Sequence, residues 1–405
     1  MSLAERAALA PVIAPERSKI AATPYICREA SSLPVRPWIY GRQFLRGSLS
    51  VIVAPGAVGK TSLLVGAAMA LVTGRPLLDK SVWDGPKRVW LWNLEDPEEE
   101  LARLIEAARL HWTVSEDHIG GRLFVDSALN GAELCIAVED NTGFRILEPI
   151  VAELVDELIR REIDILIVDP FVSSHRVSEN NNGAIDAVAK KWARVAVQAN
   201  CAIGLVHHTR KLNGAEATSE GGRGASALPN AARSVIALNR MTDQEANDLG
   251  VTPEDRRRFF RAYDDKNNRA PPAEKSDWYQ LLSVDLGNGS EGSPGDSVQV
   301  VAPWAPRDPF FGLTWEHLLK IQRRVEAGEY RKDPQSLGWV GLAVAEELAL
   351  DVSDRKGGDA LRVKKLISKW ITTGALIETR EKDHNRDLRT FVRVGELAQP
   401  EGTAP

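Results

Sequence analysis

Residues 49–74 decide the fold, and they read LSVIVAPGAVGKTSLLVGAAMALVTG. The apolar, β-branched run at 51–53 predicts a buried strand, and the segment after the loop has the period of a helix that ends at Gly74. The loop itself, 54–61, reads APGAVGKT. Glycines let a backbone curl so that successive N–H groups point inward at phosphate, and the following helix adds the positive end of its dipole. The stretch therefore predicts a phosphate-binding P-loop.

Each position of this loop has an expected role. Lys60 would reach the β- and γ-phosphates of ATP, and the Thr61 hydroxyl would ligate Mg²⁺. Ala54 stands where the strict pattern has glycine, and we expect it to pack under the loop. A chance glycine turn between a core strand and a core helix is the competing interpretation, but the flanking strand and helix favour the P-loop. The residues expected at the nucleotide are Ala54, Pro55, Gly56, Ala57, Val58, Gly59, Lys60, Thr61 and Ser62.

Composition limits the class of protein. The chain has 405 residues, enough for two or three domains, and its 43% hydrophobic and 26% charged residues are typical of soluble proteins. Three widely spaced cysteines offer neither a disulfide framework nor a zinc site. No apolar run approaches the roughly 18 residues that span a bilayer, and no signal peptide is recognisable. We therefore expect a cytoplasmic protein without membrane contact. Its net charge of −5 means that any nucleic-acid contact must be local.

A second strand is expected at 88–95, ending in Glu95. Asp96 is expected as the N-cap of the amphipathic helix that follows, with Pro97 in its first turn. Ligands of open parallel sheets lie beyond the carboxyl ends of the strands, so Glu95 is placed to polarise the water that attacks a γ-phosphate. The alternative is that Glu95 is one more acid at a helix start.

Two later strands also end in polar residues. Residues 163–169, IDILIVD, have the Walker B pattern, in which Asp169 would reach Mg²⁺. The strand at 201–206 leads into His207 and His208. Adjacent side chains of a strand point to opposite faces, so only one of these histidines can face the nucleotide. Zinc binding by the pair is the competing idea, but no third ligand lies at a suitable spacing.

The order of these features resembles the RecA-like ATPases, in particular the hexameric RepA-type replicative helicases of plasmids and related phage and mobile-element ATPases. Over residues 36–285 the blocks are APGAVGKTS, NLEDP, ILIVDP, LVHHTRK, RGASALPNAAR, MTDQEANDLGV and DRRRFFRAYDDKNNRAPP. The resemblance implies a RecA-like core with a mostly parallel sheet that binds ATP and Mg²⁺ and assembles as a homo-oligomer, most simply a hexamer. Its implied roles are phosphate and Mg²⁺ binding for Lys60 and Thr61, catalytic base for Glu95, metal binding for Asp169, γ-phosphate sensor for His208 and arginine finger for Arg233.

An arginine finger would enter the neighbouring subunit's site and stabilise the charge that builds on the phosphoryl oxygens. The other interpretation of Arg233 is a solvated charge between Ala232 and Ser234. In RecA-like proteins, the loops after the Walker B and sensor strands touch single-stranded DNA. Here they are 173–183 and 213–222. Arg176 and Lys211 are the candidate contacts, although no aromatic residue is available for base stacking.

The C-terminal sequence predicts helices at 340–350 and 359–372 and strands at 375–380 and 389–394, the layout of a winged helix-turn-helix. Nine basic and four acidic residues lie between Arg362 and Arg393. Lys364, Lys365, Lys382 and Arg386 are the candidate DNA contacts. A protein-docking module with a solvated charged face is the alternative.

These observations predict an α/β chain of five parts. They are a flexible arm (1–36), the RecA-like ATPase domain (37–300), a linker with a connecting helix (301–335), a winged-helix domain (336–396) and a disordered tail (397–405). The expected function is a Mg²⁺-dependent ATPase acting on DNA, as a ring-forming replicative helicase of a mobile element. Two alternatives remain open: an ATP-switched DNA-binding regulator or initiator, and a recombinase-like filament.

Overall fold

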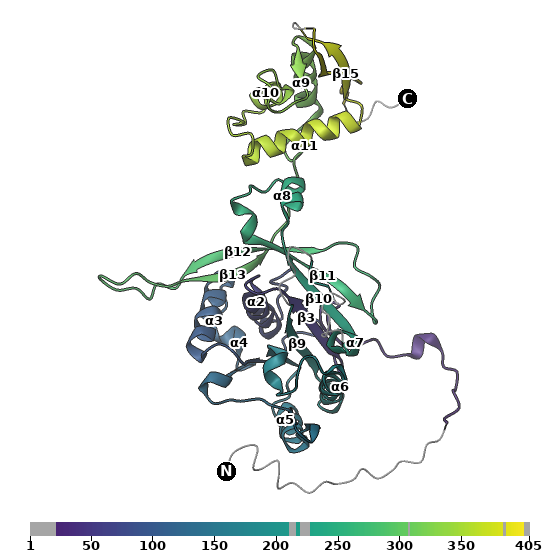
Figure 1. Cartoon of the computed structure of the whole chain (residues 1–405), viewed down its shortest axis with the longest axis vertical. Coiled ribbons are helices and arrows are strands. Elements are labelled where there is room, and N and C mark those ends of the chain that lie inside the picture. Colours follow the sequence, from purple (N-terminus) through teal and green to yellow (C-terminus); the bar gives the residue numbers. More distant parts are fainter. Residues whose placement is uncertain (1–21, 210–215, 219–226, 307, 384–385, 401–405) are drawn as a thin grey trace. The chain divides into compact units, whose positions relative to one another are not determined.

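The computed structural model describes residues 22–209, 216–218, 227–306, 308–383 and 386–400 (Figure 1). These residues form two compact units. One comprises the chain up to Arg240 together with Phe260–Trp304, and the other comprises Met241–Phe259 and Ala305–Pro405. The chain therefore leaves the first unit after Arg240, returns at Phe260 and leaves again after Trp304.

The first unit is built on a nine-stranded sheet ordered β13-β12-β11-β10-β3-β9-β8-β4-β5. Its parallel part consists of β10 (Ser234–Arg240), β3 (Leu49–Ala54), β9 (Ala202–His208), β8 (Ile165–Asp169), β4 (Val89–Asn93) and β5 (Leu123–Ser127). On the other side of β10, β11 (Phe259–Asn267) pairs antiparallel with it, and β12 (Asp277–Asp285) pairs antiparallel with β13 (Ser297–Pro303). The prediction of an α/β fold with a mostly parallel sheet is confirmed.

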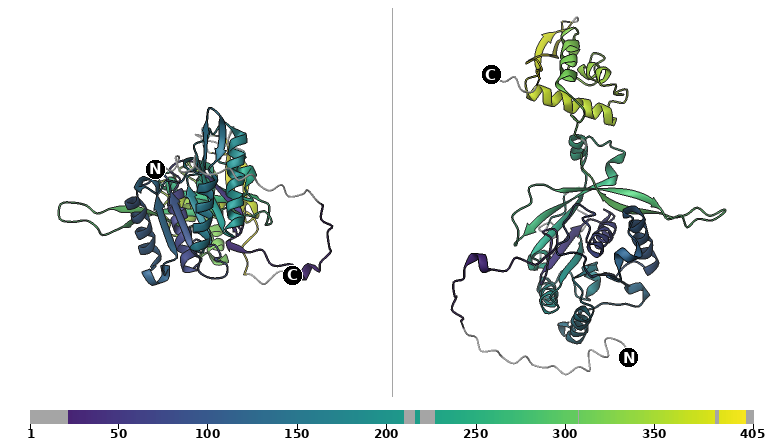
Figure 2. Two further views of the ribbon diagram at one scale, coloured as in Figure 1. Left: turned by 90° about the horizontal axis from the view of Figure 1, so that it is seen from below. Right: turned by 180° about the vertical axis from the view of Figure 1, so that it is seen from behind.

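Helices cover both faces of this sheet, which is why β3 is buried along its whole length. Val51 and Val53 belong to one core cluster with residues of α5 (Glu148–Arg160) and α6 (Asn182–Gln198). Ile52 and Ala54 belong to the opposite cluster, with α2 (Lys60–Thr73) and with Ala108 of α3 (Glu98–Trp112). Two further views show these helices around the sheet (Figure 2).

A hairpin that the sequence analysis did not predict braces the segment after β8. Its strands are β6 (Ala137–Asp140) and β7 (Gly143–Ile146). The Arg176 N–H donates to the Ala137 carbonyl at 2.8 Å, and the Glu139 N–H donates to the Arg176 carbonyl at 2.9 Å. The segment 173–183 is therefore only partly a surface loop, because Ser174 and His175 are buried.

The described residues of the second unit contain four α-helices and a three-stranded sheet ordered β14-β16-β15. The helices are α8 (Asp243–Leu249), α9 (Trp315–Glu326), α10 (Val340–Glu347) and α11 (Gly358–Thr372), and the strands are β14 (Tyr330–Arg331), β15 (Leu376–Lys382) and β16 (Leu388–Val394). Ile321 and Val325 of α9 lie in one core cluster with Trp339 and Leu366. The expected linker helix within 301–335 is therefore a core helix of this unit, because its apolar residues four positions apart form one buried face.

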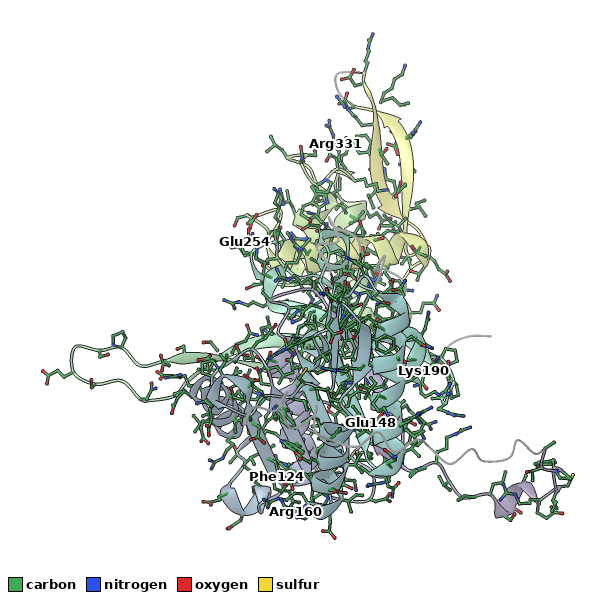
Figure 3. All side chains as sticks on the ribbon, turned by 60° about the horizontal axis from the view of Figure 1, so that its bottom comes forward. Phe124, Glu148, Arg160, Lys190, Glu254 and Arg331 are labelled. Atoms are coloured by element: carbon green, nitrogen blue, oxygen red, sulfur yellow. The ribbon has the colours of Figure 1, made fainter. Side chains whose placement is uncertain are left out.

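Three smaller results complete the fold. Pro97 occupies the N-cap of α3, so the prediction of Asp96 as N-cap is wrong by one residue. Residues 22–37 are exposed along their whole length, whereas the rest of the expected N-terminal arm lies outside the described residues. Among the helices of the described residues, none is long and apolar enough to cross a membrane. Charged side chains such as Arg160 and Lys190 lie on the outside of the first unit (Figure 3).

Candidate nucleotide-binding site

The loop between β3 and α2 has the geometry of an anion cradle. Ala57 and Gly59 have positive φ angles of 55° and 95°. Left-handed residues at alternate positions turn successive N–H groups to one side, where they can bind phosphate oxygens. Gly59 is also the N-cap of α2, so the positive end of that helix dipole faces the same place. Ala54 is fully buried at the end of β3, in agreement with its expected packing under the loop.

The antiparallel strands β12 and β13 pack against one side of this loop. A Cβ built on Gly59 would lie 2.6 Å from Leu281 Cδ2 and 3.2 Å from Gln299 Nε2. The same Gln299 amide donates to Ser62 Oγ at 3.4 Å. Gly59 is therefore required by its positive φ angle and by the absence of space for a side chain. At Gly56, by contrast, an added Cβ would meet no atom within 4 Å.

Lys60 joins the ends of two strands. Its Nζ donates to Asp169 Oδ1 at 2.7 Å and lies 2.9 Å from His208 Nε2. Asp169 ends β8 and His208 ends β9, and these strands are parallel neighbours beside β3. The exposed fractions of Lys60 and Asp169 are only 8% and 6%, so both charges are largely removed from water and depend on each other.

Thr61 and Asp169 fit the expected Mg²⁺ site. The Thr61 hydroxyl donates to Asp169 Oδ2 at 3.3 Å, so two oxygen ligands of different charge converge. Mg²⁺ prefers such oxygen ligands, and it is held by few protein groups together with water and phosphate oxygens. Within the part of the chain that the structure describes, no group of three or more His, Cys, Asp and Glu side chains is placed to hold a metal ion.

Glu95 and His208 lie side by side at the same edge of the sheet. His208 Nε2 is 3.6 Å from Glu95 Oε2, and the Glu95 side chain is 52% exposed. His207 precedes His208 on β9 and therefore points to the opposite face. Burial lowers the pKa of His207 there. The two histidines thus occupy different environments, and only His208 lies with Lys60 and Glu95.

Asn93 is a site residue that the sequence analysis missed. It is buried at the end of β4, and its Oδ1 accepts the N–H groups of Glu95 and Asp96 at 2.8 and 2.7 Å. Its amide N–H also donates to Asp96 Oδ2 at 3.0 Å. The Asp96 carboxylate, which was expected to cap α3, therefore bonds to Asn93. An Asx turn of this kind fixes the turn that carries Glu95. The available signal was an asparagine at a strand end, two residues before the candidate base.

Arg233 lies at the opposite edge of the sheet from the P-loop. It precedes β10, and its N–H donates to the carbonyl of Leu49, at the start of β3, at 2.9 Å. Ala54 is five residues further along that strand, about 17 Å away at ~3.4 Å per residue. The exposed Arg233 side chain therefore cannot reach the nucleotide site of its own chain.

Arg240 occupies the other end of β10, beside the P-loop. Its Nη2 donates to the Gly56 carbonyl at 3.3 Å and to the Ala57 carbonyl at 2.5 Å. The sequence analysis did not single out Arg240, because nothing local distinguishes it from other arginines. Only the parallel pairing of β10 with β3 brings it to the loop.

The candidate DNA contacts belong to both units of the chain. Arg176 is exposed in the segment braced by β6, and Lys211 lies outside the described residues. Lys364 Nζ donates to the Arg355 carbonyl at 2.5 Å, whereas Lys365 is directed toward Gly250. Burial lowers the pKa of both lysines.

Lys382 and Arg386 are exposed on the β15–β16 hairpin. A cavity of about 670 Å³ opens beside Lys364, between α11, residues 331–334 and the two hairpin strands. Its lining carries both signs of charge. Lys332, one of its cations, already pairs with Glu378 at 2.6 Å.

Two comparisons with known proteins bear on the first unit. The sequence model of a family described as "AAA domain" matches residues 14–214, just under half of the chain. This match includes the P-loop, Glu95, Asp169 and His208, but neither Arg233 nor the second unit, and it supports a nucleotide-binding P-loop ATPase domain. The crystal structure of the RadB recombinase aligns with a TM-score of 0.39 and 13% identity, covering 59% of this chain and 89% of that one. Neither value is high enough to transfer a substrate or a partner.

Proposed function

We propose, with a P-loop ATPase domain as the premise, that this chain hydrolyses ATP with Mg²⁺ and acts on DNA as a ring of identical subunits, in the manner of a RepA-type replicative helicase. The observation that carries the ATPase part is the convergence of Lys60, Thr61, Glu95, Asp169 and His208. The ends of β8 and β9, the turn after β4 and the loop after β3 deliver these side chains to one edge of the sheet.

Each of these side chains has a defined task in hydrolysis. Lys60 and the N–H groups of the loop bind the phosphates. Thr61 and Asp169 would hold Mg²⁺, which would supply positive charge at the phosphate oxygens. The exposed carboxylate of Glu95 orients a water and accepts its proton as the water oxygen attacks the γ-phosphorus and ADP leaves. His208 lies between Lys60 and Glu95 and is placed to respond to the γ-phosphate.

The proposal of a ring is supported by Arg233. Because it lies about 17 Å from the P-loop of its own chain, it can stabilise a transition state only in another copy. A guanidinium delivered in trans makes hydrolysis depend on subunit contact. Identical subunits that each present a site at one surface and a finger at another form a closed ring when the rotation between them closes.

ATP hydrolysis by the full chain tests the first part. Lys60→Ala is expected to abolish Mg²⁺-dependent hydrolysis, because it removes the phosphate-binding ammonium. Glu95→Gln is expected to keep ATP affinity within a few-fold while slowing turnover by about 10²-fold or more. Binding is measured by calorimetry and phosphate release by a coupled assay, with circular dichroism as the check on folding.

Two results would contradict the assignments. Unchanged turnover in Lys60→Ala would remove the P-loop assignment. Loss of ATP binding in Glu95→Gln would make Glu95 a structural residue.

A second candidate is a DNA-binding regulator whose nucleotide site controls assembly. It is favoured by the second unit, where α10, α11 and the β15–β16 hairpin follow the winged-helix order and where Lys382 and Arg386 are exposed. A helicase predicts hydrolysis stimulated several-fold by single-stranded DNA, together with strand displacement. A regulator predicts binding to duplex DNA without either effect.

A further inference from the structure

The carbonyl groups of the P-loop need partners on the side away from the nucleotide. A loop that turns its N–H groups inward at phosphate turns its carbonyls outward. The Gly56 and Ala57 carbonyls both accept from one guanidinium nitrogen of Arg240. Arg240 therefore contacts the loop from outside, opposite the surface that would hold phosphate.

Arg240 also contacts the residue of the loop that has a strained backbone, Ala57. Ala57 has a φ angle of 55°, a conformation that residues other than glycine adopt reluctantly. A hydrogen bond to the Ala57 carbonyl holds the following peptide plane in place and so helps to retain this conformation. Since left-handed geometry at Ala57 and Gly59 aims the N–H groups, the orientation of the cradle depends on this peptide.

The charge of Arg240 is available to the phosphates. Among the described residues its hydrogen-bond partners are two carbonyls and not a carboxylate, so its positive charge is not cancelled by an ion pair. Arg160 differs in this respect, because its guanidinium pairs with the Glu157 carboxylate. A guanidinium directly behind the loop adds to the positive potential of the helix N-terminus.

We propose that Arg240 is a positioning residue for nucleotide binding. It holds the Gly56 and Ala57 carbonyls outward, keeps the loop N–H groups directed at the phosphates, and contributes charge that favours a polyphosphate. This inference rests on the proposed ATPase function and deepens it. It assigns Arg240 to binding and not to the chemical step, because its contacts are on the outer side of the loop.

Calorimetric titration of the full chain with ADP and Mg²⁺ tests this role. The variants are Arg240→Gln, which loses the charge, Arg240→Lys, which keeps the charge with a single donor centre, and Arg160→Gln as the matched control. Arg160 is also exposed and hydrogen-bonded through its guanidinium, but it ends α5, on the other face of the sheet from α2.

Arg240→Gln is expected to weaken ADP binding about tenfold, as for a lost charge-assisted hydrogen bond. Arg240→Lys should recover part of that loss, and Arg160→Gln should bind like the wild type. At saturating ATP the turnover of Arg240→Gln should stay within about twofold of the wild type, because an outer-side contact does not change between bound substrate and transition state.

Three outcomes would overturn the proposal. Wild-type affinity in Arg240→Gln would show that the contact has no role in binding. A fall in the unfolding midpoint large enough to unfold part of Arg240→Gln at the temperature of the titration would mean that its loss of ADP binding is only structural. If the wild type itself does not bind ADP, the proposed function fails, and the role of Arg240 fails with it. The first two results leave the ATPase assignment intact.

Discussion

At the residue scale, the site depends on charges that are buried together. Lys60 and Asp169 share a hydrogen bond of 2.7 Å with little access to water. Removing one partner of such a pair leaves the other unpaired, which costs roughly 3 kcal/mol or more. Lys60→Ala should therefore destabilise the domain as well as remove activity, so its turnover has to be read together with its unfolding curve.

His175 should make stability depend on pH. Burial lowers its pKa to about 4. The Val177 N–H donates to its Nδ1, and Nε2 has no hydrogen-bond partner among the described residues. The unfolded chain has a histidine pKa of about 6.5. Between these two values the unfolded state binds a proton that the folded state does not. The free energy of unfolding should therefore fall as the pH is lowered from 6.5 to 4, by roughly 3 kcal/mol.

Urea unfolding at several pH values measures this effect. His175→Asn keeps an acceptor for the Val177 N–H but cannot be protonated, so its free energy of unfolding should fall less over the same interval. The neighbouring His207, whose pKa burial also lowers, should leave a smaller residual slope in the variant. The same slope in both proteins would refute the assignment.

At the scale of elements, the P-loop packs against two strands, β12 and β13, that come much later in the chain. β12 and β13 supply Leu281 and Gln299, which lie where a side chain on Gly59 would have to go. α2 begins at this glycine, so the position of its N-terminus depends on strands more than 200 residues away. The N-terminus of α2, the P-loop and the strands β12 and β13 therefore pack together.

Two alanine substitutions in the same loop should separate these constraints. Gly59→Ala forces a Cβ against Leu281 at a φ angle of 95°, and should lower the free energy of unfolding by about 2 kcal/mol. Gly56→Ala places its Cβ in open space and should change that free energy by less than about 1 kcal/mol. Denaturant unfolding without nucleotide is the measurement. Equal losses in the two variants would contradict the packing argument.

At the scale of the whole molecule, the candidate nucleotide site and Arg233 lie at opposite edges of one sheet. The residues of the candidate nucleotide site lie at the carboxyl ends of the parallel strands. Arg233 lies at the other end of these strands, directly before β10. A single copy cannot bring these edges together. The direction of the strands is therefore the reason for proposing that Arg233 acts on another copy of the chain.

Mixing subunits tests whether Arg233 acts in trans. Arg233→Ala mixed with wild type at fixed total concentration should reduce ATP hydrolysis more steeply than the fraction of variant, because each variant subunit disables a neighbour's site. Arg160→Gln mixed in the same way should leave hydrolysis unchanged. A strictly linear decline with the fraction of Arg233→Ala would argue against action between subunits.

The sequence by itself determined the P-loop, the four strands β3, β4, β8 and β9, and the placement of Asp169 and His208 at strand ends. These predictions succeed because parallel strands separated by helices place their carboxyl ends at one edge of the sheet, whatever the details of packing. The alternation of side chains on a strand likewise implied that only one of the two histidines would face the nucleotide.

Only the tertiary structure decided that His208 is the histidine beside Lys60 and that α9 belongs to the core of the second unit. It also decided that β12 and β13 cover Gly59 and that Arg240 contacts the P-loop. Each of these results depends on pairing between segments far apart in the chain. Arg240 lies 183 residues beyond Ala57, and the register of β10 against β3 alone brings them together. Local patterns carry no information about such register, because it is set by the packing of the whole sheet.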